Sequence, residues 1–376
     1  MRTYEIAVFA GDGIGPEVVG DCLRVLEAVQ AQYAQTLQAP SRGALQAPSR
    51  GVPPAGGFAL HWTHLPWGAQ HWAETGHMVP PDFLDVLRPF DAILLGAVGD
   101  PARIPDHLTL APLIQIRQAF DQYACVRPAR LLPGVRCPLA GKGPAEVDLV
   151  VVRENSEGEY VNSGGRFKVG QPDEFALQTA IHTRRGVERI LRFGFELALT
   201  RRHHLTMVTK SNAQRYGFVL WDEILEEVQG QYPAVSVDKQ HVDAAAMNMV
   251  RSPERFDVVV ASNLFGDILS EIGGIIAGGL GLAPSANVNP ERDYPSMFEP
   301  VHGSAPDIAG KGIANPVGAI LSGAMMLEWL ELGEAAAAVR RAVEATLSQG
   351  AGTPDLGGRL SSGQMTDMII QNLAGS

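Results

Sequence analysis

Short apolar runs alternate with amphipathic stretches along most of this 376-residue chain, and this alternation limits its fold more than any other feature. Each apolar run is bounded by turn residues, which is typical of a buried strand. The runs lie at 5–10, 91–95, 148–152, 205–208 and 257–261, with a further strand expected near 58–63. The amphipathic stretches predict helices at 17–31, 186–200 and 217–229, and at 317–332 and 335–347 near the C-terminus. Such alternation predicts an α/β fold built around largely parallel sheets.

Composition and charge narrow the class of protein. The chain is 45% hydrophobic and 19% charged, within the range of globular proteins, and its length predicts two or three compact units. Its net charge of −11 would repel phosphate backbones and anionic membranes, so we expect no nucleic-acid or membrane partner. Three cysteines, Cys22, Cys125 and Cys137, are too few and too irregularly spaced for a disulfide framework or a zinc knuckle, and they favour a reducing cytoplasm.

Two segments stand apart from this pattern. Residues 272–290 carry no charge, but their glycines and prolines are wrong for a bilayer helix, so we expect a buried helix that ends in a loop. Residues 37–44 recur almost unchanged as 45–52. A repeat this short and rich in Pro, Ser and Gly cannot bury a face, which predicts a flexible surface insertion over 37–57. A docking arm is the functional alternative.

A glycine cluster follows the first predicted strand and opens the first predicted helix. Gly11, Gly13 and Gly15 precede Pro16, which suits a first helical turn. The third glycine comes two residues after the second, whereas the Rossmann fingerprint requires three, and no ribose-binding acid follows at the usual distance. The cluster is therefore either a tight turn or a cofactor loop of another kind.

Three carboxylates are candidates for a metal site. Asp267 and Glu271 are four residues apart directly after a predicted strand, so they share one face of a helix near its start. Asp243 lies in an apolar Val-Asp-Ala-Ala-Ala stretch. Oxygen ligands suit Mg²⁺, which usually takes only one or two protein carboxylates. Alternatively, Asp267 offsets the helix dipole and Glu271 is solvated.

Arginines, a lysine and a tyrosine are candidates for binding anions and moving protons. Guanidinium groups bind carboxylates through two parallel hydrogen bonds, which Arg117, Arg127 and Arg153 could provide, although single arginines are more often surface residues. Lys210 follows the predicted strand 205–208, and Tyr160 lies in a glycine-flanked polar segment. Either could transfer a proton if its environment tuned its pKa.

Five long motifs occur in one order along the chain, at 11–17, 153–160, 209–212, 263–267 and 302–312. The second reads Arg-Glu-Asn-Ser-Glu-Gly-Glu-Tyr and the last begins His-Gly-Ser-Ala-Pro-Asp. Together they resemble, almost end to end, the isopropylmalate and isocitrate dehydrogenase family of metal-dependent, NAD-linked decarboxylating dehydrogenases. Within that family, 153–160, 211–217 and 289–300 are most similar to the tartrate and decarboxylating D-malate dehydrogenases.

The resemblance implies a two-domain fold outside the Rossmann group, with the active site in the cleft between the domains. Residues 1–122 and 278–376 would form an outer, cofactor-binding domain, and 123–277 a central domain for dimerisation and for substrate and metal binding. It also implies a homodimer with shared active sites. Lys210 and Asp243 would complete the site of the partner subunit, and the arm 161–178 would interlock the two subunits.

The resemblance further implies a role for each candidate residue. Arg117, Arg127 and Arg153 would bind the substrate carboxylate that is lost, and Asp267, Glu271 and the partner's Asp243 would hold Mg²⁺ or Mn²⁺. Lys210 would act as base, and Tyr160 would protonate the enol. The implied cofactor-binding residues are His302, Gly303, Ser304, Ala305, Asp307, Asn315 and Asp355. Asp307 predicts NAD rather than NADP, because a carboxylate accepts hydrogen bonds from ribose hydroxyls but repels a 2′-phosphate. For His302, a packed core histidine is the alternative.

Some residues depart from the family pattern. Glu271 and Cys125 stand where the family usually has aspartate and asparagine. Leu113 and Ile114 are apolar, as in enzymes that hold the branched alkyl group of 3-isopropylmalate, although they also suit simple packing. We therefore expect oxidative decarboxylation of a small (R)-2-hydroxy dicarboxylate, D-malate or tartrate first and 3-isopropylmalate second. A non-catalytic regulatory paralogue is a third hypothesis, which the retained tyrosine, lysine, acids and arginines make less favoured.

Overall fold

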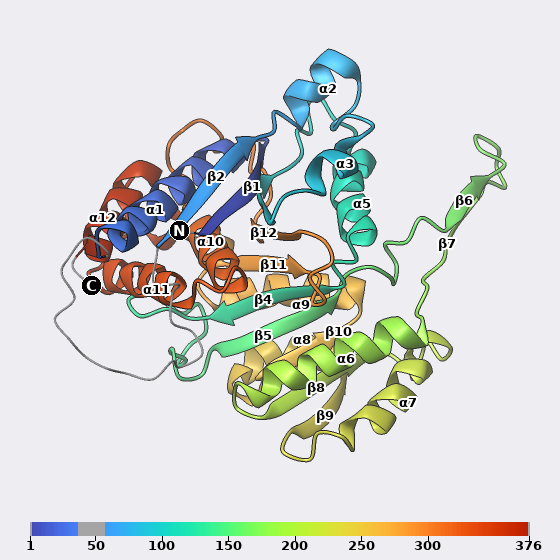
Figure 1. The fold of residues 1–376 in the computed structure, drawn as a ribbon. Coiled ribbons are helices and arrows are strands. Elements are labelled where there is room, and N and C mark those ends of the chain that lie inside the picture. The colour runs from blue at the N-terminus through green and yellow to red at the C-terminus, as the bar shows by residue number, and fades with distance from the viewer. Residues whose placement is uncertain (1, 37–56, 375–376) are drawn as a thin grey trace.

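Ten strands form one mixed sheet through the middle of the molecule in a computed structural model that describes residues 2–36 and 57–374 (Figure 1). Their order across the sheet is β2-β1-β3-β12-β11-β4-β5-β10-β8-β9. The strands are β1 (Arg2–Gly11), β2 (Phe58–His64), β3 (Ala92–Ala97), β4 (Ala124–Arg130), β5 (Asp148–Glu154), β8 (His204–Thr209), β9 (Ser236–His241), β10 (Val258–Ala261), β11 (Pro284–Val288) and β12 (Ser296–Pro300).

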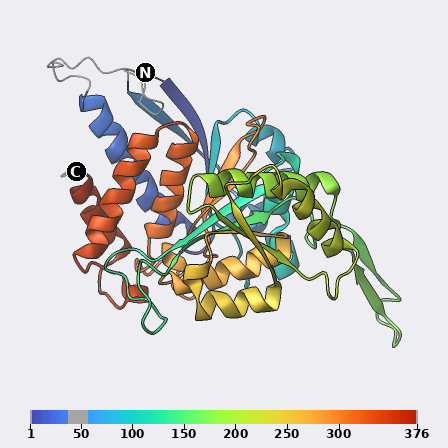
Figure 2. The same ribbon diagram turned by 90° about the horizontal axis from the view of Figure 1, so that it is seen from below.

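Helices cover the sheet in separate groups at its two halves (Figures 1 and 2). Beside the β1 half lie α1 (Gly15–Thr36), α2 (Ala69–Thr75), α3 (Phe83–Leu87), α4 (Asp106–Thr109), α5 (Ala111–Ala119), α10 (Val317–Trp329), α11 (Gly333–Ser348) and α12 (Ser362–Ala374). Beside the β8 half lie α6 (Arg184–Leu199), α7 (Gly217–Gln229), α8 (Val242–Arg251) and α9 (Asn263–Ile276). Short 3₁₀ turns occur at Pro253–Arg255, Leu280–Leu282 and Pro354–Leu356.

The sheet is parallel at both ends and antiparallel in its middle. The pairings β12 with β11, β11 with β4, and β4 with β5 are antiparallel, and the other neighbouring strands run parallel. Most neighbouring strands are thus parallel, as predicted, and the antiparallel pairs are confined to the centre of the sheet. No helix lies between β4 and β5 in the described chain, and without a crossover helix the chain returns in the opposite direction.

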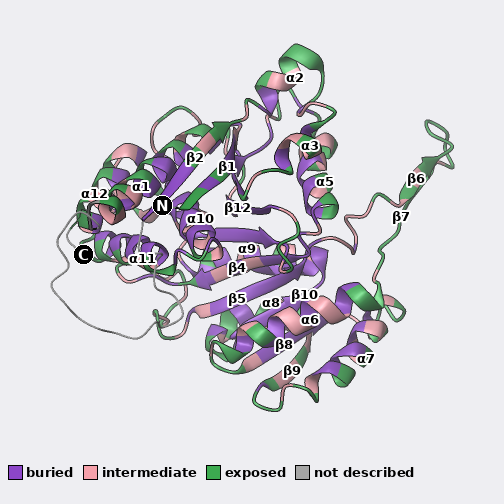
Figure 3. Ribbon diagram, in the orientation of Figure 1, coloured by how far each residue is buried: buried purple, intermediate pink, exposed green. Residues whose placement is uncertain are grey.

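Both faces of the sheet are buried at β1, which explains its unbroken apolar sequence. Ile6 and Val8 belong to one hydrophobic core, and Ala7 and Phe9, which alternate with them, belong to a second. Figure 3 shows the sheet buried along most of its length, with exposed residues on the outer faces of the helices. Burial on both faces is typical of strands in α/β proteins.

The uncharged segment 272–290 differs from its prediction. Helix α9 ends at Ile276, and Gly278 and Gly279 follow with φ of 112° and 134°, a region that L side chains rarely adopt. The chain then forms β11, a fully buried strand paired on both sides by β4 and β12. The prediction of a helix that ends in a loop is therefore wrong for the second half of this segment, because the sheet supplies the backbone hydrogen bonds that a loop would lack.

The sheet runs without a break across the predicted boundary between outer and central domains, since Ala286 of β11 pairs with Val126 of β4. The division into 1–122 with 278–376 and 123–277 stays a prediction. The predicted insertion 37–57 lies outside the described residues, apart from its last residue. No helix in the described ranges is both long enough and apolar enough to cross a bilayer.

The predicted arm 161–178 contains a two-stranded antiparallel hairpin, β6 (Gly164–Phe167) with β7 (Phe175–Gln178), that projects from the body of the molecule (Figure 1). Its apolar side chains Phe167, Phe175 and Leu177 are each about half exposed, at 45%, 49% and 55%. Apolar surface this accessible is typical of a segment that contacts another protein.

A histidine near the base of this arm predicts a pH dependence of stability. Trp221 Nε1 donates to His182 Nδ1 at 3.2 Å, and burial lowers the pKa of His182 from its usual value of 6.5, against the opposing charges of Glu159 and Glu157. The unfolded chain therefore takes up a proton first as the pH falls through about 6.5. The stability that the neutral ring contributes is present above that pH and is lost below it.

We expect the His182→Gln variant to lose less stability than the parent chain between about pH 7.5 and about pH 5.5. Urea unfolding at both pH values measures the difference, and replacement of the exposed His77 by Gln is the control. Equal losses in the His182 variant and the parent would contradict the assignment.

Candidate functional site

A cavity at the centre of the sheet brings together residues from both of its halves. Its lining comes from β3, β4, β5, α5, α9 and β12 and includes Arg117, Arg127, Arg153, Tyr160, Asp267 and Glu271. These residues are far apart in the sequence, and each was predicted to belong to the site. The cavity opens where several strands end, the usual place for a ligand in an α/β sheet.

The three arginines are buried and pair with carboxylates of the cavity. Arg127 Nη1 donates to Asp267 Oδ1 at 3.2 Å and lies 3.8 Å from Glu271 Oε1. Arg153 Nη1 donates to the same oxygen of Asp267. The two arginine side chains are only 9% and 2% exposed, whereas those of Asp267 and Glu271 are 31% and 45% exposed, so buried cations meet partly exposed acids at the cavity wall. The prediction that Asp267 and Glu271 share a helix face is confirmed, because both reach Arg127 from α9.

Burial raises the pKa of both acids, and the neighbouring arginine charges lower it. Burial alone would raise the pKa of Asp267, but Arg153 and Arg127 outweigh it and hold that pKa below its usual value. Burial raises the pKa of Glu271, although Arg127 opposes the change. The neighbouring charge of Asp267 acts in the same direction as burial. Asp267 therefore ionises more readily than Glu271.

Tyr160 contacts the same carboxylate. Its hydroxyl donates to Asp267 Oδ2 at 2.8 Å, and its ring lies 5.2 Å from the Arg153 guanidinium carbon. Burial, followed by the charge of Asp267, raises the pKa of Tyr160 to about 12. The phenol therefore keeps its proton at neutral pH and can donate it.

The position of the Arg117 guanidinium depends on a residue that was not predicted to belong to the site. Its Nη2 donates at 2.8 Å to Oε1 of Glu299, which lies in β12 and is 6% exposed. Asn287 donates to the same oxygen at 2.8 Å. Glu299 stands in the segment 289–300 that carried the resemblance, but that segment alone does not indicate a partner for it. Glu299 lines the cavity and fixes the guanidinium of Arg117.

The apolar wall of the cavity differs in part from its prediction. Leu113 lines the cavity and is 4% exposed. Ile114 is not among the lining residues, because the next position on a helix points about 100° away. Leu110, which was not predicted, lines the cavity one turn before Ile114. Leu110 and Leu113 therefore form the apolar wall of the cavity, and substrate binding by Leu113 and Ile114 stays a prediction.

The glycine cluster packs against the loop that follows β12. Ile14 N donates to Ser304 O at 2.8 Å. A Cβ at Gly13 would lie 1.9 Å from this oxygen, and Gly13 has a φ of 60°, so the contact requires glycine. Asp12 secures the loop by accepting hydrogen bonds from Ala69 N at 2.6 Å and Gly99 N at 2.8 Å. The cluster thus forms a tight turn packed against the loop whose residues His302 and Gly303 line the cavity.

The predicted cofactor residues fall into two places. His302 and Gly303 line the cavity, and Ser304 and Ala305 follow them in the same loop. His302 is half-buried, burial lowers its pKa, and its buried Nε2 has no partner among the described residues. Asn315 Nδ2 donates to Asp355 Oδ2 at 3.0 Å, which joins those two predicted residues. Asp307 is exposed to solvent.

Lys210 and Asp243 lie together but outside this cavity. Lys210 Nζ donates to Asp243 Oδ1 at 2.7 Å, and this contact lowers the pKa of Asp243. The Asp243 side chain is 70% exposed, so the prediction of apolar surroundings is wrong. The reason is its place in the first turn of α8, whose buried face carries Ala245 and Met249 instead. Neither residue lines the cavity of its own chain.

The donor set of the cavity fits a hard cation. Asp267 and Glu271 offer carboxylate oxygens, and no group of three or more His, Cys, Asp or Glu suited to a metal occurs in the described ranges. Two carboxylates from one chain are within the number that Mg²⁺ usually takes from a protein. Buried Nε groups of Arg117 and Arg127 have no described partner, so the cluster also keeps unused capacity for an anion.

The fold and cavity define a class of α/β protein with a mixed sheet and a carboxylate-rich, arginine-rich central site. The sequence of residues 5–371 matches the isocitrate/isopropylmalate dehydrogenase family, and the chain belongs to that family. A solved isocitrate dehydrogenase from Methylococcus capsulatus has the same fold, with a TM-score of 0.84 and 35% identity over 98% of this chain and 99% of that one.

Similar proteins within the family are enzymes named for different substrates. A probable tartrate dehydrogenase/decarboxylase of Agrobacterium vitis is 48% identical over 100% of this chain and 99% of its own length. The decarboxylating D-malate dehydrogenase of Escherichia coli is 46% identical, with 99% of both chains covered. A 3-isopropylmalate dehydrogenase of Thermobifida fusca is also 46% identical, covering 99% of this chain and 98% of its own. The resemblance to this family is confirmed.

Proposed function

We propose that the chain is an NAD- and divalent-metal-dependent enzyme that oxidises and decarboxylates a small (R)-2-hydroxy dicarboxylate. The observation that carries this proposal is the cavity in which three buried arginines meet Asp267 and Glu271. Arginines suit the carboxylates of the substrate, and the acids suit a cation beside its hydroxyl. D-malate and tartrate are the first candidates, because the segments 153–160, 211–217 and 289–300 resemble the enzymes of those substrates and relatives with those names are 46% and 48% identical.

The chain's own residues would bind the substrate and move its protons. When bound, a divalent ion would lower the pKa of the substrate hydroxyl and stabilise negative charge, and NAD would accept the hydride from C2. Arg117, Arg127 and Arg153 would hold the carboxylate that leaves as CO₂. Lys210 of the partner subunit would take the hydroxyl proton at Nζ, and Tyr160 would deliver a proton from its hydroxyl to the carbon that loses CO₂.

A second copy of the chain is part of this proposal, because Lys210 and Asp243 lie outside the cavity of their own subunit. Helices α8 and α9 pack side by side (Figure 2). They expose Met247 and Val250 on α8, and Ile268 and Ile275 on α9, each by about half. Apolar residues at such spacing on paired helices favour burial against another subunit. A homodimer would cover them and bring Lys210 and Asp243 to the neighbouring cavity.

3-Isopropylmalate is the second candidate substrate, and a specific observation favours it. Leu110 and Leu113 form an apolar wall of the cavity beside Arg117. Such a wall could hold a branched alkyl group, whereas D-malate and tartrate carry hydrogen or hydroxyl there. An apolar pocket discriminates weakly against smaller groups, so the wall alone does not decide between them.

A panel assay tests the proposal. Purified protein with NAD and Mn²⁺ is offered D-malate, tartrate, 3-isopropylmalate and isocitrate, and NADH and CO₂ are both measured. We expect the largest kcat/KM with D-malate or tartrate. A preference for 3-isopropylmalate would establish the second candidate, and no turnover of any substrate would favour a regulatory paralogue. The cytoplasm stays the predicted compartment, and the three cysteines are free.

Cofactor choice gives a separate prediction. We expect kcat/KM to favour NAD over NADP, because Asp307 would repel a 2′-phosphate. Asp307→Ala should raise the ratio of NADP to NAD kcat/KM by about tenfold. Steady-state kinetics with each cofactor measure this ratio, and Asp82→Ala, which removes an exposed acid before α3, is the matched control. Preference for NADP in the parent chain would contradict the role of Asp307.

A further inference from the structure

The turn that carries Lys210 is held on both sides by one carboxylate. Thr209 Oγ1 donates to Asp222 Oδ1 at 2.8 Å, and Ser211 Oγ donates to Asp222 Oδ2 at 2.8 Å. Asp222 lies in the first half of α7, which packs against β8 (Figure 1). The amino group of Lys210 itself donates to Asp243. The two neighbours of Lys210 are therefore tied to a helix, while its side chain reaches another element.

Backbone hydrogen bonds define the same turn. Ser211 N donates to Thr209 Oγ1 at 3.3 Å, and Ala213 N and Gln214 N both donate to Lys210 O, at 3.0 and 2.8 Å. The Thr209 hydroxyl thus links the backbone of the turn to α7. Thr209 is 1% exposed, so water cannot easily replace the partner of its hydroxyl, and loss of that partner is costly.

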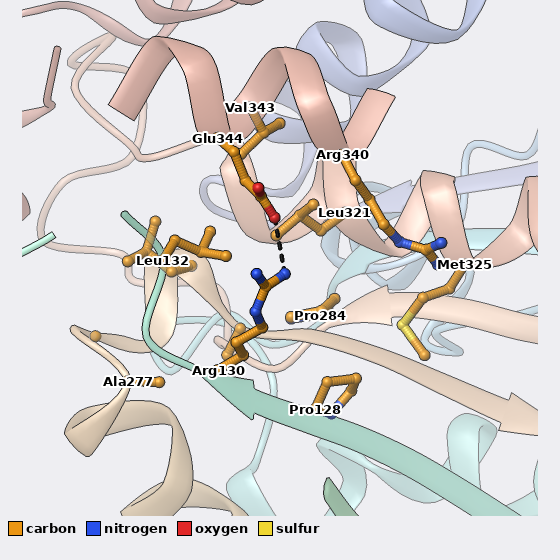
Figure 4. A pocket seen from close by; sticks show the side chains of 13 residues that line it. Pro128, Arg130, Leu132, Ala277, Pro284, Leu321, Met325, Arg340, Val343 and Glu344 are labelled. Carbon is orange, nitrogen blue, oxygen red and sulfur yellow. Dashed lines mark hydrogen bonds and ion pairs between the residues drawn. The ribbon is translucent and has the colours of Figure 1, made fainter. Parts of the chain in front are cut away.

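These contacts differ from an ordinary ion pair between a helix and a strand. Glu344 of α11 accepts from Arg130 of β4 at 2.7 Å (Figure 4), and the Arg130 side chain is 50% exposed. A pair of two long, exposed side chains holds its elements weakly. The Asp222 side chain is only 15% exposed, and it accepts from two hydroxyl groups on short side chains. Such contacts restrict the backbone of the turn directly.

Lys239 balances the charge of Asp222 from the solvent side. It donates to Asp222 Oδ2 at 2.7 Å from β9, and its side chain is 41% exposed. An exposed amino group on a long, flexible side chain can leave this contact at little cost. The two hydroxyl contacts, rather than the ion pair, therefore set the position of the turn.

We propose that Asp222 is a positioning residue for Lys210. By holding Thr209 and Ser211 it fixes the backbone on either side of Lys210, and so the place from which this side chain extends toward Asp243. The inference rests on the proposed function, because it takes Lys210 as the base of the reaction. A displacement of about 1 Å in a catalytic group is enough to lower a rate by about 100-fold.

Turnover on two backgrounds tests whether Asp222 acts through Lys210. Asp222→Ala should lower kcat for the preferred substrate by about 10- to 100-fold and change KM by less than about twofold, because the arginines that would bind the substrate are elsewhere. On the Lys210→Met background, the same replacement should lower kcat by less than about twofold. A residue that served the fold alone would lower kcat equally on both backgrounds.

A conservative variant and a milder one extend this test. Asp222→Asn should recover most of the kcat, because an amide can accept from one hydroxyl and donate to the other. Ser211→Ala, at a partly exposed residue, removes one of the two contacts and should give a smaller loss than Asp222→Ala. It keeps the test valid if Asp222→Ala does not fold.

Two control variants keep both hydroxyl contacts. Lys239→Met removes only the solvent-side partner of Asp222, and Glu223→Ala changes the next residue of α7, which is exposed. Both should retain the kcat and the KM of the parent chain.

Hydrogen exchange of the full-length protein follows the turn without the need for activity. The amides of Ala213 and Gln214, which donate to Lys210 O, should exchange at least about tenfold faster in Asp222→Ala. Peptides of α9 in the same protein should exchange as in the parent, and mass spectrometry measures both. Asp222→Asn should leave the exchange of the turn unchanged.

Three outcomes would overturn the inference. The first is a kcat of Asp222→Ala equal to that of Glu223→Ala. The second is an equal fall in kcat on the parent and Lys210→Met backgrounds. The third is unchanged exchange of the amides of the turn in Asp222→Ala. Full turnover in Lys210→Met would instead contradict the proposed function, since it would remove the base and not the contacts that hold its turn.

Discussion

Replacement of Lys210 by methionine is expected to lower kcat by about 10²- to 10⁴-fold, the range for loss of a general acid or base. Methionine keeps the length of the side chain and removes the amino group. Because Lys210 is partly exposed and its ion-pair partner Asp243 is exposed, the fold should remain intact. Turnover of the preferred substrate and the urea midpoint of the same preparation measure both effects.

Lys239 provides the matched control for this variant. It donates to Asp222 Oδ2 at 2.7 Å from the neighbouring strand β9 and is also a partly exposed lysine paired with one acid. Lys239→Met should retain the kcat of the parent. A Lys210→Met enzyme with kcat equal to that of Lys239→Met would show that Lys210 is not the base.

Replacement of Asp267 by asparagine is expected to have the second large effect, on metal binding, turnover and stability together. The carboxylate is the point at which Arg127, Arg153 and Tyr160 meet. Its removal deletes the more readily ionised of the two proposed cation ligands and leaves the charge of the buried Arg153 without its carboxylate partner. We expect Mn²⁺ affinity to fall by at least about tenfold and the free energy of unfolding by about 2 kcal/mol.

Calorimetric Mn²⁺ titration and urea unfolding test this expectation without the need for activity. Asp85→Asn, at an exposed acid of α3, is the control and should change neither quantity. Glu271→Gln should weaken Mn²⁺ less than Asp267→Asn, because burial already raises the pKa of Glu271 and makes it the poorer anion. Unchanged Mn²⁺ affinity in Asp267→Asn would remove this residue from the metal site.

Local patterns predicted much of the fold. The run at 205–208 became β8 and the stretch at 217–229 became α7, because both their periodicity and their boundaries are local properties. The antiparallel middle of the sheet was not predicted, because strand direction depends on connections across the whole chain. Strand β11 was missed for a related reason. Its sequence is rich in Ala, Pro, Ser and Asn, and only its pairing with β4 and β12 makes it a strand.

The site was predictable wherever spacing or a long motif carried it. Helical spacing predicted that Asp267 and Glu271 share one face, the resemblance implied their role and that of the arginines, and the fold brings all of them to one cavity. Glu299 was missed because nothing in its local sequence indicates that it faces Arg117 from a strand 182 residues away. Ile114 was predicted by comparison with enzymes that hold the alkyl group of 3-isopropylmalate, whereas the cavity is lined by Leu113 of α5 and by Leu110 just before that helix.

A mixed dimer tests directly whether each active site is built from two chains. Lys210→Met and Asp267→Asn subunits, each carrying a different affinity tag, are produced together, and only the hybrid is purified. If Lys210 serves the cavity of the partner subunit, one site of the hybrid carries both changes and the other carries neither. The hybrid should then regain about half of the parent turnover, although both parental homodimers are nearly inactive. A hybrid as inactive as the two variants would show that Lys210 and Asp267 act within one chain, and would contradict the shared site.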